Sequence, residues 1–364
     1  MHKSTLLNNE SQKCPRPHVG SSLNTVPFSV IINEKRTLRN ILPEEQLSIY
    51  KPVRVIGHGD NGVVYECITV EKKKVAIKRI LEDPTLKSRE IQILKILDSK
   101  NVVKYLGHFY TPSPKPHIKY HHIVMEEFPM TLETFIQSNV TYPRIYIKLF
   151  AFQIFAGLAY IHSNGIIHRD ISLSNILVDP RTGQLKICDF GCSKFYNPKE
   201  TNTPYMYERP FRAPELIYET SGYFSAVDIW AAGCIYAFLL RGSNLFTGTS
   251  HVAQLYDMIR ILGPPSPSAI QFYLQFGGQK IRIPQQQTSS LQREIPGAEK
   301  SEIEFLQKVF EFDPLKRIRA KEAIECHCFD ELFRRNTMLP NNIPLPVLDR
   351  EGFNPNKEIP VEEE

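Results

Sequence analysis

The sequence lacks any uncharged apolar run long enough to cross a lipid bilayer, which requires about 20 residues. The longest such run, Ile229–Leu240, is shorter and predicts a buried core helix. The residues that follow Met1 also lack the apolar core of a signal peptide. We therefore expect a soluble, intracellular protein with no membrane partner.

The sequence also has little net charge and no cysteine framework. Its 44 Lys and Arg residues against 39 Asp and Glu residues leave a net charge of +5, with the two signs interspersed. This balance favours an ordinary solvated surface and no nucleic-acid partner. The seven cysteines are odd in number and scattered, which fits a reducing compartment. Cys326-His327-Cys328 has no second pair at zinc spacing, so no zinc site is expected there.

What the sequence does have is a long stretch of ordinary globular composition between two polar ends, with 42% hydrophobic and 23% charged residues overall. Residues 1–49 predict a mostly flexible arm with one candidate strand at Phe28–Ile32. Residues 50–335 predict the folded region, which is long enough for one two-lobed domain or two ordinary ones. Residues 336–364 are rich in proline, end in glutamates and predict a solvated tail.

The folded region is organised around a polar loop that contains His168-Arg169-Asp170 and, five residues later, Asn175. A long amphipathic segment, Tyr146–His162, precedes the loop, and two short apolar runs follow it. The loop therefore lies between a predicted helix and a predicted hairpin. This spacing is typical of a protein kinase catalytic loop, although an aspartate in a loop often only forms a turn.

A glycine-rich turn, Gly57-His58-Gly59-Asp60-Asn61-Gly62, lies between two apolar runs near the start of the folded region. Val63 and Val64 follow the last glycine, which favours a strand over the helix that opens a dinucleotide-binding fold. We therefore predict a hairpin whose glycines let backbone amides approach phosphate groups. Without the other motifs, an ordinary glycine-rich hairpin would be the simpler interpretation.

Several charged residues accompany apolar segments elsewhere. Lys78 lies in an apolar strand, and Glu90 lies twelve residues later in a segment with helical periodicity. Strand lysines are usually at edges, but these two charges would pair if they face each other across a phosphate site.

Two further motifs come later in the chain. Asp189-Phe190-Gly191 follows the catalytic loop. Ala213-Pro214-Glu215 comes later, with Arg317 as the expected buried partner of its glutamate.

The order of these motifs across residues 50–335 resembles that of the eukaryotic protein kinases. The resemblance implies an α+β, two-lobed protein kinase fold. A small β-rich N-lobe with one main helix would run to about residue 126, and a larger, mostly helical C-lobe would begin after about residue 130. Four segments narrow the resemblance to a divergent member of the glycogen synthase kinase-3 family, in the CMGC group. They are Arg89–Ile93, Leu158–Ser163, Phe211–Ile217 and Ala232–Cys234.

The resemblance implies a serine/threonine kinase that uses ATP and Mg²⁺, in the cytoplasm, the nucleus or both. Asp170 would accept the proton of the substrate hydroxyl. Lys78 and Glu90 would position the phosphates, and Asn175 and Asp189 would bind Mg²⁺. The residues expected to contact the nucleotide, including the gatekeeper Met125 and the hinge, are Ile56, Gly57, His58, Gly59, Asp60, Asn61, Gly62, Val63, Val64, Ala76, Lys78, Met125, Glu126, Phe128 and Asp189.

The family also prefers substrates that already carry a phosphate C-terminal to the target serine, and it binds this priming phosphate with three basic residues. The matching positions here are Arg89, Arg169 and Lys194. Two guanidinium groups and an ammonium suit a dianionic phosphate. Each could equally be a solvated or structural charge. Tyr205 aligns with the activation-segment tyrosine that the family phosphorylates on itself.

One position departs from the family. The family has a lysine two residues after the catalytic aspartate, where it contacts the transferred phosphoryl group, and this chain has Ser172. Loss of that charge should cost roughly 10²-fold or more in rate. The alternative interpretation is therefore a pseudokinase scaffold that binds nucleotide or partners with little catalysis. Against it, Lys78, Asp170, Asn175 and Asp189 are all retained.

Residues 251–263 predict an amphipathic helix ended by Gly263, with an apolar stripe that most often belongs to a protein core. In the family, this helix and the following loop form a groove for a helical peptide from scaffold proteins. Val252 and Leu255 match the family there, whereas Tyr256 replaces a smaller apolar residue. The expected partners are substrate proteins and, at this groove, a scaffold peptide.

Overall fold

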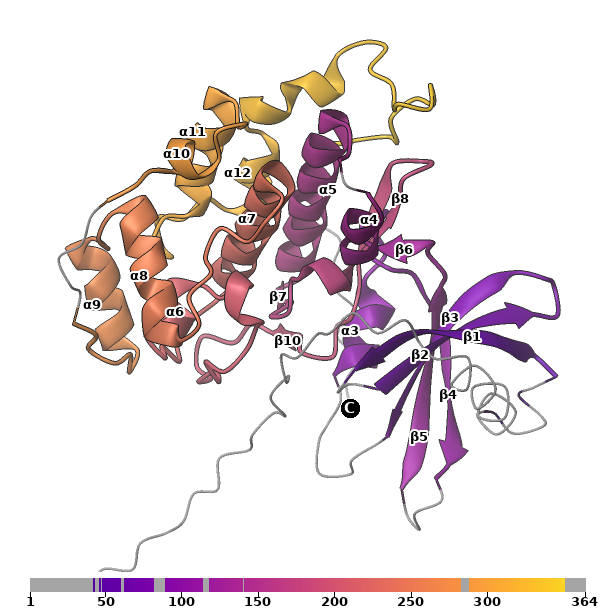
Figure 1. Cartoon of the computed structure of the whole chain (residues 1–364). Helices are drawn as coiled ribbons and strands as arrows, with labels where there is room; N and C mark the ends of the chain where they lie inside the picture. The colour runs from indigo at the N-terminus through magenta and orange to yellow at the C-terminus, as the bar shows by residue number, and fades with distance from the viewer. Residues whose placement is uncertain are drawn as a thin grey trace, which may run out of the picture.

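The computed structural model describes residues 42, 46, 48–59, 62–81, 89–113, 118–139, 141–282 and 288–350. These residues form two lobes, a twisted sheet with one helix and a larger helical body (Figure 1). The predicted two-lobed α+β fold is therefore confirmed. The candidate strand at Phe28–Ile32 and nearly all of the predicted arm lie outside the described residues.

The N-lobe is a five-stranded antiparallel sheet in the order β1-β2-β3-β5-β4. Tyr65, Ile77 and Val124 are cross-strand neighbours and bury one face of the sheet in a small core. Aromatic and β-branched residues suit such a pleated, buried surface. The strands are β1 (Tyr50–Gly59), β2 (Gly62–Thr69), β3 (Lys74–Leu81), β4 (Tyr105–Pro112) and β5 (Lys119–Glu126).

Helix α3 (Glu90–Ile96) lies between the sheet and the C-lobe (Figure 1). Its buried residues belong to the same hydrophobic core as the C-lobe helices. The segment after the helix is tied to the C-lobe by two main-chain bonds. The N–H of Val103 donates to the carbonyl of Ile187, and the N–H of Ile187 donates to the carbonyl of Asn101, each at 2.9 Å. These bonds limit how far α3, and the Glu90 that opens it, can move from the C-lobe.

The C-lobe is built around two long helices, α5 (Arg144–Ser163) and α7 (Ala226–Arg241), which lie side by side (Figure 1). Among the described helices, α5 alone is long and apolar enough to cross a membrane, but 78% of its most apolar window is buried inside the protein. The remaining elements are β6 (Met130–Thr131), α4 (Leu132–Ser138), β7 (Ile166–Ile167), η1 (Leu173–Asn175), β8 (Ile176–Asp179), β9 (Gln184–Ile187), β10 (Lys194–Phe195), η2 (Arg209–Phe211), α6 (Pro214–Ile217), α8 (His251–Leu262), α9 (Pro267–Gln275), α10 (Leu291–Glu294), α11 (Lys300–Val309), α12 (Ala320–Ile324) and η3 (His327–Phe333).

Local capping sets the ends of the C-lobe helices. Helix α7 ends at Gly242, whose φ of 81° is left-handed and whose N–H donates to the carbonyl of Phe238 at 2.7 Å. Helix α8 begins after Ser250, whose hydroxyl accepts the N–H of Ala253 at 3.1 Å, and it ends at Gly263. The helix predicted over residues 251–263 is present.

The described part of the predicted solvated tail, residues 336–350, is mostly exposed but is anchored to the domain at a few residues. Leu339 is 2% exposed, and Leu348 packs against the main hydrophobic core. The ammonium of Lys100, in the loop that follows α3, donates to the carbonyl of Val347 at 2.9 Å. Proline-rich composition suggested a solvated segment, but its spaced leucines cover apolar surface of the domain.

Candidate active site

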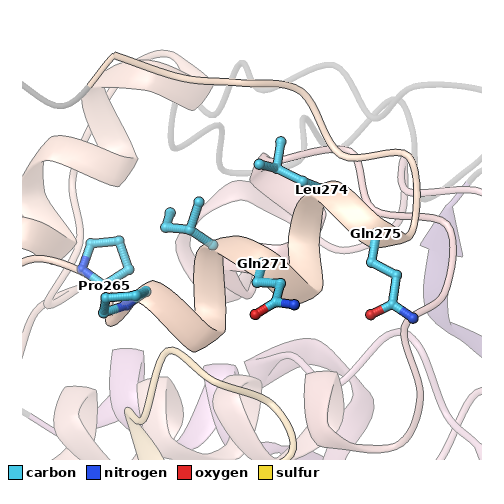
Figure 2. A pocket seen from close by; sticks show the side chains of 6 residues that line it. Pro265, Gln271, Leu274 and Gln275 are labelled. Carbon is cyan, nitrogen blue, oxygen red and sulfur yellow. The ribbon is translucent and has the colours of Figure 1, made fainter.

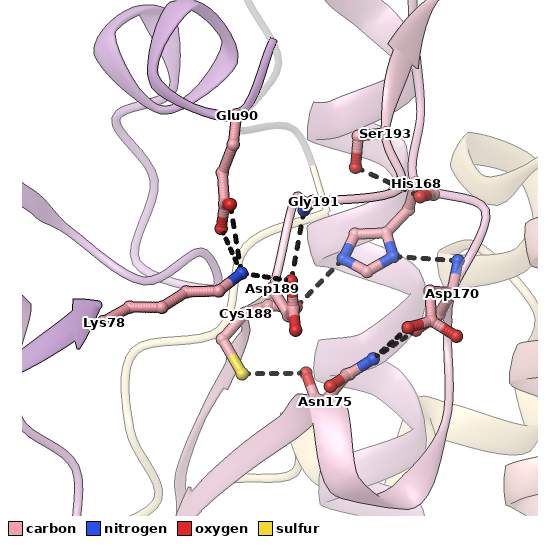
Figure 3. A network of polar contacts seen from close by, with 9 residues as sticks. All are labelled: Lys78, Glu90, His168, Asp170, Asn175, Cys188, Asp189, Gly191 and Ser193. Atoms are coloured by element: carbon pink, nitrogen blue, oxygen red, sulfur yellow. Dashed lines mark hydrogen bonds and ion pairs between the residues drawn. The ribbon is translucent and has the colours of Figure 1, made fainter. Parts of the chain in front are cut away.

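The predicted catalytic residues meet in one polar network, although they come from distant parts of the chain (Figure 3). Lys78 comes from β3, and Glu90 is the first residue of α3. Asp170 and Asn175 lie in the segment between β7 and β8, and Asp189 follows β9. The sheet, the N-lobe helix and the C-lobe loops therefore each supply part of the site.

Lys78 is the centre of a buried ion-pair cluster. Its Nζ lies 2.8 Å from Oε1 and 3.0 Å from Oε2 of Glu90, and 2.8 Å from Oδ1 of Asp189. Burial alone would lower the pKa of Lys78, but the two carboxylates outweigh burial and raise it. Burial would raise the pKa of Asp189, yet Lys78 holds it below its usual value. The predicted ion pair is therefore present and keeps one fixed cation in the site.

The backbone of Asp189-Phe190-Gly191 directs the Asp189 carboxylate toward Lys78 (Figure 3). Asp189 has a left-handed φ of 61°, which few non-glycine residues adopt, and its Oδ1 accepts the N–H of Gly191 at 3.1 Å. Phe190 is fully buried, and its ring meets the His168 ring edge-on with 4.9 Å between centroids. The buried ring anchors the segment in which the carboxylate is held.

His168 is a buried imidazole that joins the catalytic loop to this segment. Its Nε2 lies 3.0 Å from the carbonyl oxygen of Cys188, so Nε2 carries the proton. Its Nδ1 accepts the N–H of Asp170 at 3.3 Å. Burial lowers the pKa of His168, in keeping with this neutral form. The residue is thus structural and orients the backbone of Asp170.

Asp228, near the start of α7, holds the catalytic loop in its unusual conformation. Its Oδ2 accepts the N–H of His168 at 2.9 Å and Nε2 of His162 at 2.8 Å, while Oδ1 accepts the N–H of Arg169 at 2.9 Å. Burial would raise the pKa of Asp228, but the bond and charge of His162, with His168 and Tyr207, together outweigh burial and lower it. Arg169 has a φ of 66°, and these bonds to consecutive N–H groups stabilise that backbone.

Tyr207 is a functional-site residue that sequence reasoning missed. It lies in the activation segment, is 7% exposed and donates its hydroxyl proton to Oδ1 of Asp228. The activation segment and the catalytic loop therefore share one buried carboxylate. No local pattern could have indicated this contact, because the two residues are 21 positions apart and no spacing rule links them.

Asp170, the candidate base, is held by Asn175. The Nδ2 of Asn175 donates to both the carbonyl oxygen and Oδ2 of Asp170, each at 2.8 Å. Burial, followed by the negative charges of Asp189 and Glu208, raises the pKa of Asp170 to about 7. A carboxyl group that titrates near neutral pH is suited to accepting a proton during catalysis.

Asn175 and Asp189 fit the oxygen ligands that Mg²⁺ prefers. Because the amide nitrogen of Asn175 donates to Asp170, its Oδ1 is directed away from that residue. Neither this oxygen nor Oδ2 of Asp189 accepts a hydrogen bond from the described residues. Across that same part of the chain, no group of three or more His, Cys, Asp or Glu residues could hold a metal. A cation here would need further oxygens from phosphate groups.

Ser172 brings no positive charge to the site. It is 2% exposed, and its Oγ lies 3.0 Å from Oγ of Ser174. Glu208, on the activation segment, instead places a negative charge near enough to raise the pKa of Asp170. The electrostatic surroundings of Asp170 therefore differ from those of a kinase that has a lysine at position 172.

The glycine-rich turn forms the predicted hairpin and not a helix. Strands β1 and β2 pair as far as Gly59 and Gly62. Gly62 has a φ of 122°, and a Cβ there would lie 2.2 Å from the carbonyl oxygen of Arg79, so only glycine fits. Asp60 and Asn61 lie outside the described residues. His58 is exposed, and the other hairpin residues predicted to contact nucleotide are half-buried, namely Ile56, Gly57, Val63 and Val64.

The hinge begins at the end of β5. Met125 pairs across the sheet with Ala76 of β3, which brings two predicted nucleotide contacts together. The N–H of Glu126 donates to the carbonyl of Lys104 at 3.0 Å, and its carboxylate lies 2.8 Å from the ammonium of Lys186. Glu126 is therefore held in place by contacts with both the N-lobe and the C-lobe.

One of the three predicted phosphate-binding residues, Lys194, contacts a carboxylate in this structure. Lys194, on β10, is 6% exposed and donates to Oε2 of Glu200 at 3.0 Å. This bond, a second one from Asn197 and, to a smaller extent, the charge of Arg89 lower the pKa of Glu200. Arg89 is exposed and precedes the first residue of α3.

Arg169, the third predicted residue, has other partners. Its Nε donates to the carbonyl of Cys192 at 2.6 Å, and one of its terminal nitrogens lies 3.4 Å from the hydroxyl of Tyr223. The carbonyl of Tyr223 accepts a hydrogen bond at 2.9 Å from Asn202, which also bonds to Lys194. Arg169 therefore adjoins the same cluster without contacting Glu200.

The activation segment is held by main-chain contacts around Tyr205, which is 64% exposed. Arg212 donates from Nε to the carbonyl of Met206 at 3.1 Å and from a terminal nitrogen to the carbonyl of Tyr207 at 2.8 Å. Further along, the guanidinium of Arg317 donates to both carboxylate oxygens of Glu215 at 2.7 and 2.9 Å. That predicted buried pair is present and fixes the end of the segment.

The predicted partner helix, α8, buries most of its apolar stripe in the core, as the sequence indicated. Of the two residues that match the family groove, Leu255 is fully buried and Val252 is 41% exposed, so only Val252 is accessible to a partner. Tyr256 is half-buried. Helix α9, next along the chain, borders a hollow of about 900 Å³ (Figure 2). The hollow is lined by Pro265, Pro267, Ile270, Gln271, Leu274 and Gln275.

The two-lobed fold and the network around Lys78 and Asp170 define a protein kinase. The protein kinase domain family matches residues 50–329. The chain is 37% identical over 335 residues to Protein kinase gsk3 of Schizosaccharomyces pombe, covering 89% of this chain and 84% of the relative. It is 34% identical over 327 residues to Glycogen synthase kinase 1 of Pyricularia oryzae, covering 88% and 82%. The chain therefore belongs to the glycogen synthase kinase-3 family of protein serine/threonine kinases.

Proposed function

We propose that this kinase transfers the γ-phosphate of ATP to protein serine or threonine hydroxyls with Asp170 as the base. The observation that best supports this is the assembled charge network. Lys78 contacts both Glu90 and Asp189 at 2.8 Å. Asn175 holds Asp170 at 2.8 Å. Phosphoryl transfer by kinases depends mainly on positioning and charge stabilisation, so an assembled network is the principal requirement.

The nucleotide would lie under the glycine-rich hairpin, with its phosphates at Lys78. Adenine would bond to the hinge main chain at Glu126 and Phe128, behind Met125. Because the N–H of Glu126 already donates to the carbonyl of Lys104, Glu126 would offer its carbonyl oxygen. This arrangement uses the half-buried hairpin side chains as the apolar cover of the purine ring.

Asn175 and Asp189 would hold Mg²⁺, which when bound neutralises charge on the phosphates. Asp170 would accept the proton of the substrate hydroxyl, and Asn175 would keep its carboxylate oriented. Since the pKa of Asp170 is raised to about 7, roughly half of this group is ionised at neutral pH. Activity should therefore increase as pH rises through 7.

A scaffold with little catalysis is the second candidate, because Ser172 and Glu208 leave Asp170 with less positive charge nearby. Transfer of radiolabelled phosphate from ATP to a protein substrate separates the two. We expect transfer by the unmodified chain and none by Asp170→Asn, with both variants melting normally. Equal signals from the two proteins would favour the scaffold.

We propose further that the enzyme prefers primed substrates. Lys194 donates a hydrogen bond to the Glu200 carboxylate, and the charge of Arg89 contributes to the lowered pKa of that carboxyl group. Both observations support an anion-binding role for this surface. A peptide with phosphoserine four residues C-terminal to its target serine should therefore outcompete the unphosphorylated peptide. Arg89→Ala should reduce that preference roughly tenfold, the usual effect of one lost charge-assisted contact. Equal rates on both peptides would rule out priming.

Protein substrates are the principal partners, and a helical scaffold peptide is a second one, at α8 and the hollow beside α9. Because Leu255 is buried, the exposed Val252 is the residue to test. Val252→Glu should release such a peptide without changing the melting temperature, whereas retention of every bound partner would argue against this site. We propose a location in the cytoplasm, the nucleus or both.

A further inference from the structure

Lys194 does not face open solvent in this structure. The residue is 6% exposed, and its ammonium has two partners, Oε2 of Glu200 at 3.0 Å and Oδ1 of Asn202 at 2.8 Å. A buried cation is costly unless it is paired, so this position requires an anionic or strongly polar neighbour. Within the chain, Glu200 supplies the negative charge.

Glu200 is more exposed and less firmly held than Lys194. Its side chain is 53% exposed, and it lies on a turn in which its N–H donates to the carbonyl of Asn197 at 3.1 Å. The amide of Asn197 donates in turn to Oε1 of Glu200, also at 3.1 Å. Both bonds lie within one four-residue turn, so Glu200 can leave Lys194 without disturbing any helix or strand.

We infer that Glu200 is a resident anion that occupies the phosphate pocket and must be displaced by a priming phosphate. This inference rests on the proposed preference for primed substrates and names what regulates that site. Two observations support it: the bond from the buried Lys194 to Glu200 and the solvent exposure of the Glu200 carboxylate.

The competition between the two anions favours phosphate. A carboxylate carries one negative charge, whereas a phosphoserine carries about 1.5 to 2 negative charges and three acceptor oxygens. Exposed ion pairs such as that of Glu200 are weak, so its displacement opposes phosphate binding only modestly. Asn202 stays bonded to Lys194 and keeps the ammonium in place during the exchange.

Two consequences follow for catalysis. The affinity for primed peptides is lower than it would be in an empty pocket, because each binding event must displace Glu200. The turnover of unprimed peptides does not depend on that exchange, since Glu200 stays in place throughout.

Glu200→Gln tests this directly, because it removes the charge and keeps the shape. Glu71→Gln is the matched control, since Glu71 is also an exposed glutamate, paired with Lys73 at 2.9 Å in the N-lobe. Binding of a fluorescent phosphoserine peptide to the full chain is measured by polarisation without ATP. We expect Glu200→Gln to bind roughly twofold to fivefold more tightly than the unmodified chain and Glu71→Gln to bind equally. KM for the primed peptide should fall by the same factor.

Equal or weaker phosphopeptide binding by Glu200→Gln would overturn the inference, as would an equal gain in Glu71→Gln. If the phosphopeptide binds the unmodified chain no better than its unphosphorylated form, the proposed priming site itself fails. Absence of phosphate transfer would count against the proposed catalysis alone, because the polarisation measurement does not require turnover. The three failures are therefore distinguishable.

Discussion

Replacing Ser172 with lysine should raise kcat/KM for ATP and move its pH dependence. The variant restores one positive charge two residues after Asp170, whose pKa is raised to about 7 by burial and by the charges of Asp189 and Glu208. The lysine would act in two ways. It would stabilise charge on the transferred phosphoryl group, and it would lower the pKa of Asp170.

The two effects have different magnitudes and pH dependence. Stabilisation of the transition state by one charge is worth about 10²-fold and does not depend on pH. A charge about 5 Å from a carboxylate, at an effective dielectric constant of about 20, is worth about 3 kcal/mol, or about 2 pKa units. With a pKa of about 7, Asp170 is roughly one-tenth ionised at pH 6 and nearly all ionised at pH 8. The lower pKa of Asp170 should therefore increase the rate by a further factor of about ten at pH 6 and by almost nothing at pH 8.

The assay is kcat/KM for ATP against pH between 6 and 8.5, because kcat/KM reports the pKa values of the free enzyme, to which the value of about 7 belongs. Ser172→Gln serves as the control, because it adds length without charge in a position that is 2% exposed. The ratio of Ser172→Lys to the unmodified enzyme should exceed 10² at pH 8 and increase toward pH 6. An unchanged kcat/KM and an unchanged profile, in a variant with normal melting temperature, would refute the reasoning.

Three further predictions follow from buried groups. Asp170→Asn should abolish phosphate transfer. It should also raise the free energy of unfolding by about 2–4 kcal/mol at pH 8 and by little at pH 4. The reason is that ionisation of Asp170, which occurs above a pKa of about 3.9 in the unfolded chain, is penalised in the folded state. Burial lowers the pKa of His121 to about 4, so the folded state resists protonation of this residue. The contribution of His121 to the free energy of unfolding is therefore greatest above about pH 6.5 and falls by about 1 kcal/mol per pH unit below it. Urea titrations at pH 7, 6 and 5 should show that His121→Phe removes this loss. Tyr207→Phe leaves Asp228 one donor short and should lower the free energy of unfolding by about 1–3 kcal/mol and also lower kcat. Tyr205→Phe, at an exposed tyrosine, should leave the free energy of unfolding unchanged.

Much of the catalytic site could be predicted because its chemistry depends on residue types at short, fixed spacings. Asp170 and Asn175 are five residues apart in one loop, and the backbone that joins them brings them within 2.8 Å. The hairpin was predictable for a similar reason, since valines after Gly62 favour a strand and only glycine tolerates its φ of 122°. In both cases the residues that carry the function also determine the local backbone conformation, so the sequence predicts both.

Prediction was less complete where a contact depends on tertiary packing. The helical period of α8 was correct, but which apolar residues face the core depends on neighbouring elements, and Leu255 proved to be buried. The contacts of Leu339 and Leu348 in the tail were not predicted, because proline content describes local flexibility and not what lies beneath the segment. Glu200 gave no signal either, since an acidic residue in a polar turn is ordinarily solvated.

Tyr207 and Glu208 show how one unpredicted contact can contribute to the electrostatics of the candidate base. The hydroxyl of Tyr207 is bonded to the buried Asp228, which also fixes the backbone of the catalytic loop. Glu208, the next residue, is therefore held near Asp170 by its neighbour's anchor, and its negative charge contributes to the raised pKa there. The absence of a lysine at position 172 removes a positive charge that the family places two residues after Asp170. Because a raised pKa means a smaller ionised fraction and not a weaker base, Glu208 acts by limiting how many enzyme molecules carry an ionised Asp170 at neutral pH.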